Sequence, residues 1–300
     1  MPTNSLPFTV IITSRDEEKT LGHALDALLH QTGAVPGEVI VLCPDGPSAN
    51  IVTRYAAQYP QVRLVRDLGV GKPAALNLGL PQATYDIVAL TDGDVYVDAD
   101  ALRPLIEPLR DPSVGAVSGR PVSLNDRGTM LGYWSHVLVE AGAHRLRLRR
   151  TGQGQPIECS GYLYAFRRKL VDHVPEEVLS DDGYISMQVW SQGYRIRYAP
   201  EARVYVRFPT TFRDWLRQKI RGVAGYYQPY LKNRPVMRSF WNEAVFGLWN
   251  TLSFARTPRE LLWTLLLLAA RVYVWFRGWL DVRLRPKSFQ QLWERVESTK

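Results

Sequence analysis

The 300-residue sequence predicts an α/β protein with a mainly parallel sheet, followed by a helical C-terminal region. Two observations support this prediction. Short β-rich runs alternate with helical patterns through the first half, and after residue 208 basic and aromatic residues recur at helical spacing. A hydrophobic content of 46% is enough for a sizeable core. We therefore expect two regions, at residues 1–208 and 209–300.

The elements of the first region follow one another as strand, helix and strand. Strands are predicted at residues 8–13, 38–43, 62–67 and 86–90, and helices at residues 21–29, 51–59 and 72–80. This repeated unit is typical of parallel strands joined by crossover helices. In an open parallel sheet, ligands bind outside the carboxyl ends of the strands. The stretches "TSRDEE", "PDG" and "TDGD" each follow a strand, so we expect a binding site where they meet.

The last of these stretches places two carboxylates beside a glycine. Asp92 and Asp94 flank Gly93, and Mg²⁺ or Mn²⁺ is often held by one or two carboxylates together with substrate phosphates. The alternative is a capped turn with solvated acids. An EF-hand calcium loop does not fit, because its glycine is sixth rather than second. Asp98 and Asp100 precede a helical pattern, where acids favour the helix N-terminus.

Three other groups of residues are candidates for chemistry. Lys72 follows a glycine at a helix start and could meet a diphosphate, although a proline follows it where a Walker A loop has Ser or Thr. Asp181 and Asp182 enter a predicted helix, either as a general base site or as an acidic first turn. Gln218 and Arg221 lie three residues apart on a basic helix, facing either a phosphate ligand or solvent.

The C-terminal third carries the basic surplus. Residues 205–300 hold 17 Lys and Arg against 6 Asp and Glu, whereas residues 1–204 hold 20 against 23. This asymmetry indicates contact with membrane headgroups or nucleic acid, or else a solvated basic face. Residues 210–231 form a basic pattern with an aromatic apolar face, which is typical of interfacial helices. The longest uncharged run, Leu261–Ala270, is shorter than a bilayer core, so we expect a packed or interfacial helix, although snorkelling arginines leave a spanning one open.

Several other classes of protein are disfavoured. Two cysteines cannot form a disulfide framework, which favours a reducing, cytosolic compartment, and the N-terminal residues lack the pattern of a secretory signal. The five histidines are scattered, neither cysteine has a metal-spaced partner, and no G-x-S-x-G motif is present.

The motifs, taken in order, resemble those of the family 2 glycosyltransferases, which have the GT-A fold. The similar stretches are "TSRDEEKTL", "PDG", "GKPAALNLGL", "DGD", "SGYLYAFRR", "SDD" and "QKIRG", within residues 8–228. The resemblance implies that the nucleoside and diphosphate are held by Thr13, Glu17, Asp45, Lys72 and Asp92. It also implies that Asp94, with Asp92, binds Mg²⁺ or Mn²⁺, that Asp182 is the catalytic base and that Gln218 and Arg221 close over the diphosphate. Gly161, Tyr162 and Asp181 would lie on the acceptor side.

The chain departs from the family pattern at one informative position. Gly222 stands where the Q-x-x-R-W signature has a tryptophan, a residue that the family often uses beside the acceptor sugar. Trp215, Tyr226 and Tyr227 are the candidates to supply an aromatic face instead. Arg15 and Asp16 also replace the Tyr and Asn of the opening motif.

The resemblance and the charge pattern together predict a function. We expect an inverting, metal-dependent glycosyltransferase that uses a UDP-linked nucleotide sugar in glycolipid or polysaccharide synthesis. The acceptor would be a sugar or a lipid-linked sugar, and the basic C-terminal region would bind an anionic membrane surface at its cytoplasmic face rather than nucleic acid. The alternatives are a nucleotidyltransferase acting on sugar phosphates and a non-catalytic, membrane-binding protein of the same fold.

Overall fold

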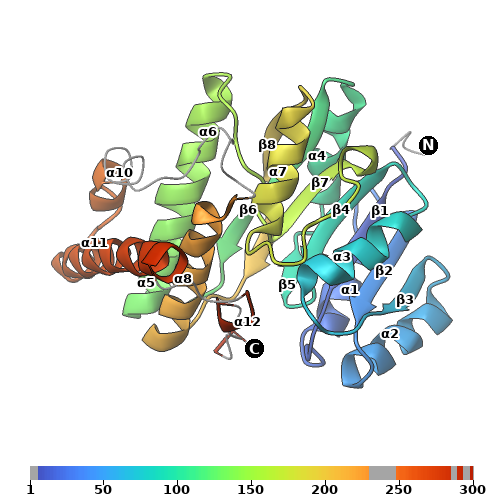
Figure 1. The fold of residues 1–300 in the computed structure, drawn as a ribbon, viewed down its shortest axis with the longest axis horizontal. Helices are drawn as coiled ribbons and strands as arrows, with labels where there is room; N and C mark the ends of the chain where they lie inside the picture. Colours follow the sequence, from blue (N-terminus) through green and yellow to red (C-terminus); the bar gives the residue numbers. More distant parts are fainter. Residues whose placement is uncertain (1–5, 230–247, 285–288, 293–297, 300) are drawn as a thin grey trace.

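A computed structural model describes residues 6–229, 248–284, 289–292 and 298–299 (Figure 1). Its centre is an eight-stranded sheet with the order β3-β2-β1-β4-β7-β6-β8-β5. The strands are β1 (Thr9–Thr13), β2 (Glu38–Cys43), β3 (Val62–Arg66), β4 (Ile87–Asp92), β5 (Val95–Val97), β6 (Val114–Ser123), β7 (Leu163–Arg167) and β8 (Arg195–Val206).

The first half of the sheet is parallel, as predicted. Strands β3, β2, β1 and β4 lie side by side, and Ile11 of β1 pairs with Ile40 on one side and Leu90 on the other. The helices between them are α1 (Leu21–Leu29), α2 (Pro47–Gln58) and α3 (Lys72–Gly79). The four strands and three helices expected here are therefore confirmed, with small differences at their ends.

The second half of the sheet is mixed. β7 runs antiparallel between β4 and β6, β8 runs parallel to β6, and β5 pairs antiparallel with β8. Four of the seven pairings among the described strands are parallel, which confirms the predicted mainly parallel α/β class. Because β7 enters the sheet at the edge where β4 leaves it, residues 160–162 lie next to the residues that follow β4.

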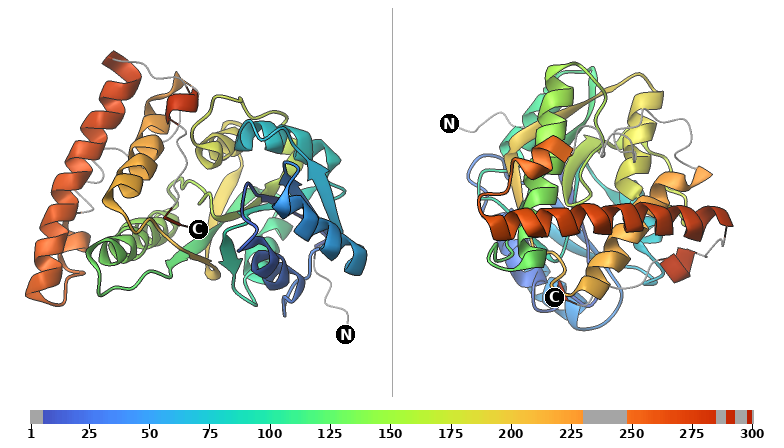
Figure 2. Two further views of the ribbon diagram at one scale, coloured as in Figure 1. Left: turned by 90° about the horizontal axis from the view of Figure 1, so that it is seen from below. Right: turned by 90° about the vertical axis from the view of Figure 1, so that its left-hand side faces the viewer.

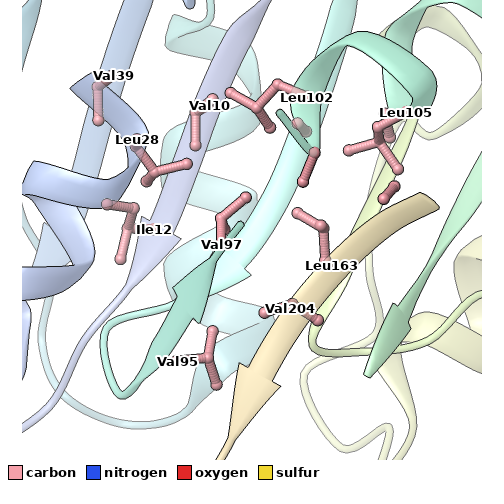
Figure 3. Packing of buried hydrophobic residues seen from close by; sticks show 14 of the residues in the cluster. Val10, Ile12, Leu28, Val39, Val95, Val97, Leu102, Leu105, Leu163 and Val204 are labelled. Atoms are coloured by element: carbon pink, nitrogen blue, oxygen red, sulfur yellow. The ribbon is translucent and has the colours of Figure 1, made fainter. Parts of the chain in front are cut away.

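Helices cover both faces of the sheet. Val10 and Ile12 of β1 point to the face covered by α1, α2 and α4 (Leu102–Ile106), as Figure 3 shows for Leu28, Leu102 and Leu105. Ile11 points to the opposite face, which α3 and α7 (Asp181–Ser191) cover. Side chains alternate between the faces because a strand has a period of two. Each fully buried aliphatic side chain contributes about 1.5–3 kcal/mol.

A third core joins the C-terminal helices to the sheet. It forms between α5 (Met130–His136), α8 (Phe212–Tyr227) and α11 (Pro258–Trp279), with α11 as the outermost layer (Figures 1 and 2). α5 continues through a π-helical segment (Val137–His144) into α6 (Arg145–Gly152). The ring centroids of Trp134 and Trp215 lie 4.9 Å apart in this core. The expected boundary between the two regions, at residue 208, therefore lies between α5 and α8, although these helices share one core. The remaining helical elements are η1 (Leu80–Gln82), η2 (Glu107–Arg110), η4 (Arg168–Leu170), α10 (Leu248–Leu252), η7 (Leu280–Leu284) and α12 (Phe289–Leu292).

α11 packs by one face only. Thr257 caps its N-terminus, accepting a hydrogen bond from the Glu260 amide, and Pro258 occupies its first turn. Buried Val274 and Gly278 face α8. Among the described residues, one helical stretch, Pro258–Leu284, is long enough and apolar enough to cross a membrane. Of its most apolar window, 28% is buried. Its exposed apolar side chains are Leu261, Leu262, Leu265, Leu266, Val272, Tyr273, Phe276 and Trp279.

Candidate active site

A cavity of about 620 Å³ lies at the carboxyl ends of β1 and β4, beneath α7, α8 and α11. Most of the residues singled out from the sequence line it, although they come from segments far apart in the chain. These are Thr13, Glu17, Lys72, Asp92, Asp94, Gly161, Tyr162, Asp181, Asp182, Gln218 and Arg221. The structure thus brings eleven of the twelve predicted site residues to one place, and their individual roles stay predictions.

Lys72 links two of the carboxylates. Its Nζ donates to Asp92 Oδ1 at 2.7 Å and lies 3.6 Å from Asp181 Oδ2, and the hydroxyl of Thr13 donates to Asp92 Oδ1 at 2.8 Å. Burial disfavours the ammonium, but Asp181 and Asp92 outweigh it and raise the pKa of Lys72. Lys72 is therefore a fixed positive charge at the strand ends.

Asp181 sits among other acids. Burial raises the pKa of its carboxyl, and Asp182 and Asp92 raise it further, whereas Lys72 lowers it. The hydroxyl of Tyr164, on β7, donates to Asp181 Oδ2 at 3.5 Å. Asp181 is thus a second acidic neighbour of the Lys72 ammonium.

Asp182 faces the segment that leads into β7. Ser180 caps α7, and its hydroxyl donates to Asp182 Oδ1 at 2.7 Å, as does the amide of Gly183 at 2.9 Å. Asp182 Oδ2 lies 3.2 Å from the position that a β-carbon on Gly161 would take. The acidic first turn and the cavity-facing carboxylate are therefore both present, because one oxygen completes the helix start while the other lies beside Gly161.

The two carboxylates around Gly93 fit a divalent cation. A β-carbon on Gly93 would lie 2.5 Å from Glu17 Oε2 and 2.8 Å from Ser14 Oγ, so a side chain has no room here. Asp94 lines the cavity with Asp92. No cluster of three or more His, Cys, Asp or Glu that could hold a metal occurs among the described residues. A site of this kind takes its remaining oxygen ligands from a bound diphosphate and water, as Mg²⁺ and Mn²⁺ sites commonly do.

α8 closes the cavity from above. Arg221 lines the cavity with Tyr162, Asp181 and Asp92; burial lowers the pKa of its guanidinium, while these three groups act in the opposite direction. The side chain of Gln228 accepts from the Leu179 amide and donates to the Glu177 carbonyl, both at 2.8 Å. These bonds hold the end of α8 against the loop that precedes α7, the helix that begins with Asp181 and Asp182.

One predicted residue lies elsewhere. Asp45 is not among the described residues that line the cavity, and its exposed carboxylate pairs with Arg66. Asp67, which follows β3, lines the cavity instead, and burial raises the pKa of its carboxyl. The rule that placed ligands at strand ends could have identified Asp67, since "VRLVRD" ends in it.

Other lining residues carried no signal in the sequence. Arg147 lies on α6, and Arg271 and Trp275 lie on α11. They reach the cavity through the packing of helices that are remote in the chain, which no local pattern encodes.

Comparison with known proteins gives a consistent family. A family model described as "Glycosyltransferase like family 2" matches residues 6–225. Poly-beta-1,6-N-acetyl-D-glucosamine synthase of Staphylococcus aureus (strain COL) is 30% identical over 167 residues, covering 54% of this chain and 40% of that protein. The synthase of the same name from Staphylococcus epidermidis is 24% identical over 239 residues, covering 77% and 56%. The chain thus spans about half the length of these relatives.

Two solved structures share the fold. The mannosyltransferase PcManGT from Pyrobaculum calidifontis, solved with GDP-Man and Mn²⁺, has a TM-score of 0.61 at 23% identity, covering 96% of this chain and 77% of that one. S. aureus TarS 1-349 has a TM-score of 0.51 at 16% identity, covering 93% and 92%. The first likeness confirms the expected GT-A-like fold with its additional C-terminal apolar helix.

Proposed function

Because this chain belongs to the family 2 glycosyltransferases, we propose that it is an inverting, metal-dependent enzyme that transfers a sugar from a nucleotide-sugar donor to an acceptor hydroxyl. The observation that carries the proposal is the meeting of Lys72, Asp92, Asp94, Asp182 and Arg221 in one cavity. The reaction needs positive charge that stabilises the leaving diphosphate, and it needs a carboxylate that accepts the proton of the acceptor hydroxyl.

The proposed chemistry follows from these two requirements. The acceptor oxygen attacks the anomeric carbon and its proton passes to Asp182 Oδ2, while the bond between that carbon and the diphosphate oxygen breaks. Lys72 and Arg221 stabilise the negative charge that appears on the departing diphosphate. A divalent cation held by Asp94 and Asp92 would supply Lewis-acid stabilisation to the same leaving group. One carboxylate base without a second nucleophile corresponds to a single displacement, which inverts the anomeric centre.

The donor and the setting belong to the same proposal. We retain a UDP-linked sugar as the donor, and the GDP-mannose bound to the solved mannosyltransferase makes GDP-sugars the first alternative to compare. The synthase relatives support a sugar acceptor in polysaccharide synthesis, and the proposal keeps a lipid-linked sugar and glycolipid synthesis from the motif resemblance. The apolar face of α11 and the basic C-terminal third support work at the cytoplasmic surface of an anionic membrane.

The first prediction tests the site directly. Incubation with UDP- and GDP-sugars and Mn²⁺ should release a nucleoside diphosphate, and EDTA should abolish the release. Asp94→Asn and Asp182→Asn should each lower turnover at least about 100-fold, because each removes a charge that the transition state needs. Asp100→Asn is the matched control, since this exposed acid pairs with Arg103 at 2.9 Å outside the cavity.

Two results would contradict the assignment. Full turnover by Asp182→Asn would remove that residue as the base, and full turnover in EDTA would remove the metal. Release of pyrophosphate in place of a nucleoside diphosphate would identify nucleotidyl transfer instead.

A further inference from the structure

One stripe of α8 faces the cavity. Gln218, Gly222 and Tyr226 are four residues apart, so they lie on the same side of the helix, and all three line the cavity. Gly222 leaves this stripe open, because a β-carbon built on it would meet no described atom within 4 Å. The next side chain along the stripe is Tyr226.

The structure separates the three aromatic candidates near Gly222. Trp215 is buried, with its ring stacked on Phe212 at 6.0 Å. Tyr227 packs edge-on against Trp275 at 6.1 Å and is not among the described residues that line the cavity. Tyr226 is half-buried and lines the cavity, so it is the one of the three placed to meet a ligand.

Tyr226 is held in a fixed position. Its hydroxyl donates to Glu158 Oε2 at 3.1 Å, and Glu158 is buried, with 3% of its surface exposed. The ring of Trp275 lies 6.4 Å away, centroid to centroid, on the α11 side. Arg271, one turn before Trp275 on α11, lines the same cavity, and its guanidinium carries several N–H groups. A rigid aromatic ring beside polar donors is typical of a site that binds a saccharide.

Building on the proposed function, we propose that Tyr226, backed by Trp275 and flanked by Arg271, is a subsite for a sugar ring of the acceptor. This ring is displaced from Gly222 by one helical turn, about 5.4 Å. The acceptor's terminal sugar then lies in the same cavity with its hydroxyl at Asp182, and the next sugar lies on Tyr226. The substrate class is therefore an acceptor of at least two sugar residues.

The second prediction compares acceptors of different length. The probes are the mono-, di- and trisaccharides of N-acetylglucosamine and of mannose, added with the donor that releases most nucleoside diphosphate. In the unmodified protein the KM for the disaccharide should be at least about tenfold lower than for the monosaccharide, a difference of about 1.4 kcal/mol. Tyr226→Leu should erase this difference, whereas Tyr226→Phe, which keeps the ring, should retain most of it.

Two further variants sharpen the test. Tyr227→Leu is the matched control, since this neighbour also contacts Trp275, and it should keep the unmodified preference for the disaccharide. Gly222→Trp in the Tyr226→Leu background should not restore the preference for the disaccharide, because its ring lies one helical turn away from the position of Tyr226. Circular dichroism melting curves check that each variant folds.

The outcomes separate this inference from the proposed function. Failure to release a nucleoside diphosphate from any donor would overturn the proposed function and the subsite with it. Donor turnover with equal KM values for mono- and disaccharides, or with no saccharide accepted, would overturn the subsite alone. Equal effects of Tyr226→Leu and Tyr227→Leu would do the same.

Discussion

At the scale of single residues, Lys72 has the largest consequences. It is 15% exposed and neutralises two carboxylates that come from different parts of the chain, Asp92 of β4 and Asp181 of α7. Removing one member of a buried charge cluster leaves the others uncompensated, which typically costs about 3–5 kcal/mol for a fully buried pair and less here. In the proposed mechanism the same ammonium also stabilises the diphosphate, so the proposal makes both stability and turnover depend on Lys72.

The third prediction follows for Lys72→Met. Its melting temperature should fall, because Asp92 and Asp181 lose their common partner, and nucleoside diphosphate release should fall at least about 100-fold. Lys72→Arg should keep the fold and part of the activity. Lys169→Met, at an exposed lysine, serves as control. A Lys72→Met protein with unchanged melting and turnover would disprove both roles.

The prediction of site residues from the sequence depended on strand ends. Thr13 and Asp92 could be placed because each terminates a strand that periodicity identifies, and Asp67 could have been placed in the same way. The position of Asp45 outside the cavity lining could not be predicted. Its side chain pairs with Arg66 at the surface, and the sequence does not determine this rotamer.

At the scale of elements, close helix contacts set the position of the cavity roof. A β-carbon on Gly225 of α8 would lie 3.2 Å from Ser180 Cβ, and one on Gly278 of α11 would lie 2.7 Å from Val223 Cγ1. α8 thus rests on the start of α7, and α11 rests on α8. Because Gly278 contacts Val223, a shift of α11 would also displace α8, the helix that carries Arg221.

The fourth prediction uses these contacts. Gly278→Ala should lower the free energy of unfolding by about 1–3 kcal/mol, because its methyl group overlaps Val223. Gly152→Ala is the matched control, since a β-carbon there meets nothing within 4 Å and alanine favours the helix by up to about 1 kcal/mol. Urea unfolding of both variants measures the difference. Equal or increased stability of Gly278→Ala would mean that α11 does not rest on α8 at this point.

Elements of the second half were less predictable for a physical reason. β7 is flanked by β4 and β6, and its antiparallel direction follows from pairings between residues 46 to 80 positions apart, from Ser118 with Tyr164 to Ile87 with Arg167. Periodicity reports the burial of a segment, not its neighbours or direction. The parallel half could be predicted because each crossover helix fixes the direction of the next strand.

At the scale of the whole molecule, α11 and the charge distribution give the chain two different surfaces. The outer side of α11 presents leucine and aromatic side chains to solvent, while the sequence from residue 205 onward is strongly basic. An exposed apolar face near positive charge is typical of helices that lie in a membrane interface.

The fifth prediction concerns this surface. The protein should bind vesicles that contain phosphatidylglycerol more tightly than neutral vesicles, and alkaline carbonate should release it, because an interfacial helix is not locked across the bilayer. Replacing Leu262 and Leu265, both about half exposed, with Gln should weaken binding, whereas Leu148→Gln on α6 should not. Retention in carbonate would indicate a spanning helix, and absence of vesicle binding would exclude the surface as a membrane contact.

The antiparallel pairing of β7 with β4 brings together two separate stretches of sequence that line the cavity. The described residues that line the cavity come from two stretches of the sequence, 13–94 and 147–299. The hydroxyl of Thr91, near the end of the first stretch, donates a hydrogen bond to the Tyr162 carbonyl in the second at 2.9 Å. Recombination between homologues could therefore exchange one of these stretches, changing the acceptor while the nucleotide-sugar donor stays the same.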